Sequence, residues 1–171
     1  MAIQYERIKK TIAALAAYGT LPQGGTTRLS YTAEYLAAQA FLQREMLESG
    51  MLAEVDPIGN LIGTYVGREP ELTAVMSGSH LDTVPAGGNF DGVLGIVAAL
   101  ECVRSWQEEG YRPKRTVRVI ATIEEECTAF GMACFGVRVR GGEFKKTAAG
   151  VYRAFDRRLP GRMSAGSRTA A

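Results

Sequence analysis

Apolar side chains recur every three to four residues in three stretches of the chain, and this spacing predicts three amphipathic helices. The helices are expected over residues 3–18, 32–49 and 92–108. Gly19 and Gly50 follow the first two stretches, where glycine can end a helix. Thr32 fits the N-cap of the second helix, because its hydroxyl can accept a hydrogen bond from a free backbone amide. The apolar stripe of that helix is predicted to lie in the core: Tyr35, Leu36, Ala38, Phe41, Leu42 and Met46.

Short apolar runs between the helices predict β-strands. They cover residues 52–55, 61–66, 72–76 and 116–123, and the last is apolar enough to be a buried strand. Turn residues at 56–60 indicate a hairpin between the first two runs. Because strands alternate with helices, the expected fold is α/β, with a mixed, mainly parallel sheet and helices on both faces.

Composition and charge narrow the class of protein. A chain of 171 residues with 46% hydrophobic and 22% charged residues is typical of one globular domain. A net charge of +2 predicts neither nucleic acid nor a membrane surface as a partner. We expect a cytoplasmic protein, because there is no apolar run of transmembrane length and no signal-peptide pattern at the start. Three cysteines without zinc-pair spacing agree with a reducing compartment, and we expect them to be small buried apolar residues.

The composition changes near Glu143. From residue 145 to 171 the chain is rich in arginine and lysine, poor in large aliphatic residues, and without clear periodicity. We therefore divide the chain into an N-terminal region over residues 1–144 and a basic tail over residues 145–171, for which poor order is an expectation. Two origins of the tail stay open, a frameshift in the gene and a genuine solvated segment.

Three polar segments fall where an α/β sheet places functional groups, at the carboxyl ends of strands and the starts of helices. They are Ser77–Pro85, which contains His80 and Asp82, the glycine-rich 87–92 with Asp91, and the run 124–126 of three glutamates. Imidazole and carboxylates together suit zinc, manganese or a related ion. Each segment also has an ordinary structural explanation, as a satisfied histidine, a tight turn or a solvated acidic face. Their order along the chain favours a metal site.

Geometry indicates roles for these side chains. His80 can give one ring nitrogen to a metal, and Asp82, two residues later in extended chain, can accept the other ring N–H. Asp91 lies in a glycine-rich turn, where a carboxylate could bridge two ions. Within the glutamate run, one side chain can ligate a metal while a neighbour takes a proton from water.

These motifs resemble the metal-site motifs of the zinc aminoacylase and carboxypeptidase clan. The double glycine before Phe90-Asp91-Gly92, the segment Thr27–Thr32 and the segment Val55–Leu61 are similar to the branch of N-carbamoyl-L-amino acid hydrolases and allantoate amidohydrolases. The resemblance covers most of the chain from about Gly24 to Gly142. It implies that residues 1–144 are the N-terminal part of a zinc-exopeptidase-type catalytic domain.

The resemblance also implies particular roles. His80 would ligate one of two divalent ions, zinc or manganese, with Asp82 as the residue that orients it. Asp91 would bridge the two ions, Glu125 would be the general base and Glu126 a ligand of the second ion. Glu124 receives no role. The substrate would be a small N-carbamoyl or ureido amino-acid derivative, whose linear C–N amide bond is hydrolysed.

Members of the family are longer than this chain, and the sequence is expected to be truncated. The family takes two further histidine ligands and a lid and dimerisation domain from downstream, whereas His80 is the only histidine here. We therefore expect weak metal binding and little or no activity from this chain alone. The family homodimer is not expected of it either. Two alternatives stay open, an aminoacylase or peptidase of the same clan and a non-catalytic fragment.

Overall fold

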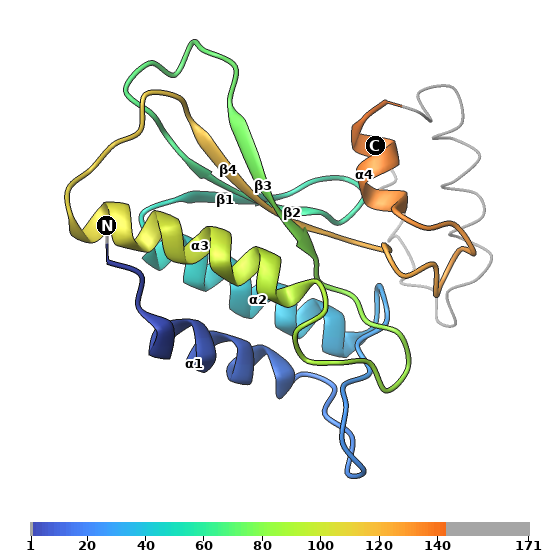
Figure 1. Cartoon of the computed structure of the whole chain (residues 1–171). Coiled ribbons are helices and arrows are strands. Elements are labelled where there is room, and N and C mark those ends of the chain that lie inside the picture. The colour runs from blue at the N-terminus through green and yellow to red at the C-terminus, as the bar shows by residue number, and fades with distance from the viewer. Residues whose placement is uncertain (1, 143–171) are drawn as a thin grey trace, which may run out of the picture. The chain divides into compact units, whose positions relative to one another are not determined.

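The computed structural model describes residues 2–142 (Figure 1). The chain divides into two units, Met1–Val137 and Arg138–Ala171. All the elements described below belong to the first unit, except α4 (Phe135–Arg140), which crosses the boundary. The predicted basic tail lies outside the described residues. No helix among the described residues is long and apolar enough to cross a membrane.

Four strands form one mixed sheet: β1 (Leu52–Val55), β2 (Leu61–Tyr65), β3 (Val75–His80) and β4 (Val117–Thr122). Their order in the sheet is β1-β2-β4-β3. The β1–β2 and β2–β4 pairs are antiparallel and only β3–β4 is parallel, so the expectation of a mainly parallel sheet does not hold for these strands. The reason is the short 56–60 turn, which can join only antiparallel neighbours. β3 and β4 are parallel because a helix connects them.

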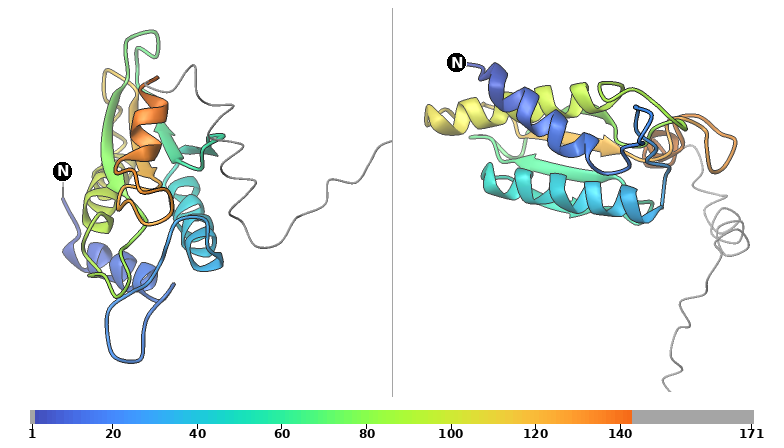
Figure 2. Two further views of the ribbon diagram at one scale, coloured as in Figure 1. Left: turned by 90° about the vertical axis from the view of Figure 1, so that its right-hand side faces the viewer. Right: turned by 90° about the horizontal axis from the view of Figure 1, so that it is seen from below.

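The three long helices match the predicted stretches: α1 (Tyr5–Ala16), α2 (Ala33–Glu48) and α3 (Val93–Glu108). Thr32 is the N-cap of α2, and its hydroxyl accepts a hydrogen bond from the Tyr35 amide at 3.3 Å. All three helices lie on one face of the sheet, with α2 against β1 and β2 and α3 against β3 and β4, so the expectation of helices on both faces does not hold for them. α1 packs on α2 and α3 on the side away from the sheet (Figure 2). One continuous apolar core lies between these layers.

Three further details of the sequence prediction are wrong. Leu36 is 53% exposed, because its place on α2 turns it away from the core that the rest of the stripe faces. The strand predicted over 72–76 begins at Val75 and continues to His80, because the Leu72 amide closes a turn onto the Glu69 carbonyl. The cysteines were expected to be buried, but none is fully buried, and Cys127 is exposed in the loop after β4.

Candidate metal centre

The turn at Asp91-Gly92 brings Asp91 against the end of β3. Gly92 has φ of 66°, a left-handed conformation that favours glycine. A Cβ at this position would lie 2.4 Å from the His80 carbonyl oxygen and 2.7 Å from the His80 ring. Only glycine therefore allows the chain to pass this close to the histidine, just before α3 begins.

His80 is the last residue of β3 and is 7% exposed. Its Nε2 atom lies 3.6 Å from Asp91 Oδ1 and 4.0 Å from Glu125 Oε2. Potential ligand atoms of His80, Asp91 and Glu126 all lie within 4.8 Å of one another. Among the residues that the structure describes, these three side chains could hold one ion. Their nitrogen and oxygen donors suit zinc or manganese.

Asp82 contacts both His80 and the segment of Glu125 and Glu126, and the sequence did not predict how it does so. His80 Nδ1 lies 2.9 Å from the backbone carbonyl of Asp82 and 3.9 Å from its carboxylate. Because a carbonyl only accepts, this contact favours a proton on Nδ1 and leaves the Nε2 lone pair facing Asp91. The Asp82 carboxylate instead accepts hydrogen bonds from the amides of Glu125 (3.3 Å) and Glu126 (3.1 Å). Burial raises the pKa of Asp82, and these two hydrogen bonds oppose the rise.

The three glutamates after β4 point to different surroundings. Glu124 is fully buried with φ of 57°, and its Oε1 atom accepts hydrogen bonds from the amides of Ala129 (2.7 Å) and Phe130 (2.9 Å). The Glu125 side chain is 37% exposed and accepts a hydrogen bond from the Cys134 thiol at 3.3 Å. Desolvation raises the pKa of Glu126, and the neighbouring Asp91 and Glu125 charges add to the rise while His80 opposes it. Glu124 therefore holds the loop that presents Glu125 and Glu126.

Arg28 supports the segment that follows His80, and the sequence analysis did not identify this role. It is 1% exposed, and its Nε donates to the carbonyl of Leu81, between His80 and Asp82, at 2.8 Å. Its backbone amide donates to the Thr83 hydroxyl and its carbonyl accepts from the Thr83 amide. Desolvation lowers the pKa of Arg28. Arg28 thus supports the turn after His80 from behind, and no periodic pattern in the sequence indicates this role.

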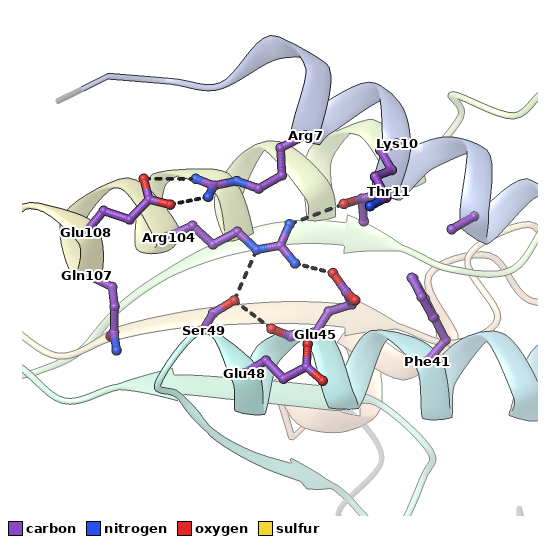
Figure 3. Close-up of a pocket in the computed structure, with 11 residues that line it drawn as sticks. Arg7, Lys10, Thr11, Phe41, Glu45, Glu48, Ser49, Arg104, Gln107 and Glu108 are labelled. Carbon is purple, nitrogen blue, oxygen red and sulfur yellow. Dashed lines mark hydrogen bonds and ion pairs between the residues drawn. The ribbon is translucent and has the colours of Figure 1, made fainter.

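A cavity with a volume of about 420 Å³ lies elsewhere, among α1, α2 and α3 (Figure 3). None of His80, Asp91 and Glu126 lines it. Its arginines bind neighbouring acidic groups: Arg7 pairs with Glu101 and Glu108, and Arg104 pairs with Glu45. These contacts join the helices, so we place the chemistry at the ends of β3 and β4 and not in this cavity.

Comparison with solved structures identifies the type of domain. A hydantoinase/carbamoylase family amidase from Burkholderia ambifaria matches with a TM-score of 0.80 and 33% sequence identity, over 82% of this chain and 34% of that chain. The described residues therefore have the fold of part of such an amidase. The expected α/β class and partial catalytic domain are confirmed, whereas the mainly parallel sheet and the helices on both faces are not found among the described residues.

Comparison of sequences gives the family. The model of Peptidase family M28 matches residues 60–151, more than half of the chain. The chain belongs to this family. An N-carbamoyl-L-amino acid amidohydrolase from Geobacillus stearothermophilus is 40% identical over 140 residues, 82% of this chain and 34% of the relative. An allantoate amidohydrolase from Escherichia coli is 40% identical over 132 residues, 77% of this chain and 32% of the relative. The chain thus spans about one third of the length of these relatives.

Proposed function

We propose that this chain carries the first part of the metal centre of a hydrolase that cleaves linear C–N amide bonds in N-carbamoyl or ureido amino-acid derivatives. The convergence of His80, Asp91 and Glu126 at the ends of β3 and β4 carries the proposal. The substrate class follows from the activities named for the relatives. An odd number of cysteines, without zinc-pair spacing, agrees with the cytoplasmic location that we also propose.

The donor set fits a divalent ion. His80 Nε2, the Asp91 carboxylate and the Glu126 carboxylate would hold it, with Asp91 shared if two zinc or manganese ions bind. A bound ion of this kind supplies Lewis acidity, which polarises a carbonyl group and makes a nearby water molecule more acidic. Zinc sites use about three or four protein ligands for each ion. Three donors are too few for two ions, so we propose that this chain alone binds metal weakly.

Glu125 is the residue that we propose as general base. Its Oε2 atom faces the cluster, 4.0 Å from His80 Nε2, and its side chain is accessible to water. It would take a proton from the water molecule that attacks the carbonyl carbon of the substrate. It would then return that proton to the leaving nitrogen as the C–N bond breaks. Asp82 acts through others, since its main chain orients His80 and its carboxylate fixes the amides of Glu125 and Glu126.

The test of this function is a substrate panel with added zinc or manganese. The panel holds N-carbamoyl amino acids, allantoate, N-acyl amino acids and dipeptides, and separates the proposal from the aminoacylase or peptidase alternative. We expect this chain alone to give little or no turnover. Any turnover should fall on N-carbamoyl or ureido compounds and disappear in Glu125→Gln. Efficient turnover of dipeptides, or turnover that survives Glu125→Gln, would contradict the proposed function.

A further inference from the structure

Cys134 contacts the proposed general base through both its main chain and its side chain. The Cys134 amide donates a hydrogen bond to the Glu125 carbonyl at 3.1 Å. The Cys134 thiol donates a second hydrogen bond to Glu125 Oε1 at 3.3 Å. The two residues are nine positions apart, so the loop after β4 has to turn back on itself to bring them together.

The return of this loop is fixed by its backbone. Shortly after Cys134, the Gly136 amide donates a hydrogen bond to the Ile123 carbonyl at 3.1 Å. A Cβ at Gly136 would lie 2.6 Å from the Ile123 carbonyl oxygen, so glycine allows the two segments to lie this close together. The place of Cys134 beside Glu125 therefore follows from main-chain pairing, and the thiol is the part of Cys134 that reaches the carboxylate.

The Glu125 carboxylate needs such a contact to keep one orientation. Its side chain is 37% exposed, and a long charged side chain that is not held samples several rotamers. Oε2 lies 4.0 Å from His80 Nε2, a separation too long for a hydrogen bond. The thiol contact on Oε1 is within hydrogen-bonding distance for sulfur, and the charge of the acceptor strengthens it. Because both oxygens belong to one rigid group, a contact that holds Oε1 also sets the direction of Oε2.

A general base is effective only when it is held within reach of the water molecule from which it takes a proton. We propose that Cys134 is a positioning residue for Glu125, whose thiol holds Oε1 so that Oε2 is directed at the cluster of three potential metal ligands. The thiol keeps its proton throughout and acts on the reaction only through Glu125. This inference rests on the role of Glu125 in the proposed function and extends it to the returning part of the loop.

The first test is the infrared S–H stretching band, which reports directly on the hydrogen bond that a thiol donates. A difference spectrum against Cys134→Ser isolates the Cys134 band, in the unchanged chain and in the Glu125→Ala background. We expect this band to move to higher frequency in Glu125→Ala, because the thiol loses its acceptor. Cys127 lies exposed in the same loop and shares the left-handed backbone, so its band is the matched control and should not move. A Cys134 band that stays in place would overturn the proposal.

The second test measures where the carboxylate points. Bound Mn²⁺ broadens the NMR signals of nearby nuclei, and this effect falls steeply with distance. With isotope-labelled glutamate and a small amount of Mn²⁺, the carboxylate signals of Glu125 and Glu126 should both broaden in the unchanged chain. In Cys134→Ala, the preference of Glu125 for this orientation should fall about twofold or more, as expected for the loss of one modest hydrogen bond. Cys134→Ser keeps a donor and should restore the broadening, and Cys127→Ala should leave it unchanged.

The Glu126 signal separates positioning from a general loosening of the loop, because a loosened metal site would lose broadening at both glutamates. Equal broadening of Glu125 in Cys134→Ala and in the unchanged chain would overturn the proposal. A loss that Cys134→Ser does not restore, or that Glu126 shares, would overturn it as well, since the side chain would then only fill space.

Failure of the proposed function would give a different result. In that case Mn²⁺ broadens neither Glu125 nor Glu126 in the unchanged chain, and the infrared band decides alone. A shifted Cys134 band would still support the hold of the thiol on Glu125, and an unshifted band would overturn it.

Discussion

The buried position and left-handed backbone of Glu124 determine where the side chains of Glu125 and Glu126 point. This residue leaves the buried end of β4 in a left-handed conformation and closes the loop onto itself through the amides of Ala129 and Phe130. Glu125 and Glu126 then lie on the side of His80, with their own amides held by Asp82. A single buried carboxylate thus fixes the direction of two residues that the proposed chemistry needs.

Glu124→Ala should test this arrangement. Removing the acceptor leaves two amides without their partner and should lower the free energy of unfolding by about 1–3 kcal/mol, with weaker metal binding as a consequence. Glu124→Gln keeps a carbonyl acceptor and should retain most of both properties. Urea denaturation and a metal titration measure the two effects. Equal stability of the alanine variant and the unchanged chain would show that the loop does not depend on Glu124.

Gly92→Ala should disturb the turn that brings Asp91 next to His80. The new methyl group would meet the His80 carbonyl oxygen and ring, and the left-handed backbone would strain any residue with a side chain. We expect a loss of about 1–3 kcal/mol in the free energy of unfolding and weaker metal binding. Gly88→Ala, in the same loop with open space around its Cβ position, is the control. Thermal melts that rank the two variants equally would contradict this account of the turn.

For single residues, the sequence indicated the side chains that gather at the candidate metal centre but did not indicate the residues that hold them in place. His80, Asp91, Glu125 and Glu126 are chemically distinctive residues at strand ends, and the structure brings their side chains together. Arg28 and Glu124 could not be assigned, because their partners are backbone groups that only the tertiary fold brings near. The same holds for Asp82, whose carboxylate binds amides on another loop and not the ring N–H of His80.

Between elements, α1 is attached to α3 through a partly buried ion pair between Arg7 and Glu101. The Glu101 side chain on α3 is fully buried and accepts hydrogen bonds from Arg7 Nε at 2.7 Å and from the Gln4 amide at 2.8 Å. The Glu101 hydrogen bonds raise the pKa of Arg7 above its ordinary value. The pair therefore fixes where α1 begins and how it lies on α3.

Arg7→Met should destabilise this contact, because it leaves the Glu101 charge buried with one remaining donor. We expect a loss of about 2 kcal/mol in the free energy of unfolding, reduced from the value for a wholly buried pair because Arg7 is partly exposed. Lys9→Met breaks the exposed pair with Glu6 on the same helix and should change stability by less than about 0.5 kcal/mol. Chemical denaturation compares the two variants. Similar small effects would mean that apolar packing alone holds α1.

Periodicity located the helices and the hairpin well, because local signals set both. The 56–60 turn is closed by Asp56, whose carboxylate accepts hydrogen bonds from the amides of Ile58, Gly59 and Asn60. The limits of β3 were missed, since its last four residues, from Ser77 to His80, carry none of the apolar alternation that identifies strands. Pairing with β4 makes these residues a strand, and such pairing is not visible in the sequence.

For the whole molecule, the central claim is that His80, Asp91 and Glu126 form one metal-binding unit within a chain that holds about a third of its relatives' length. The most direct measurement is a titration of the chain with Mn²⁺ followed by electron paramagnetic resonance. Manganese suits imidazole and carboxylate ligands and avoids the free thiols. We predict weak binding of Mn²⁺ that His80→Ala and Glu126→Ala each abolish, and that Glu48→Ala, in the cavity between the helices, leaves unchanged. Binding that persists in His80→Ala and Glu126→Ala would contradict the account.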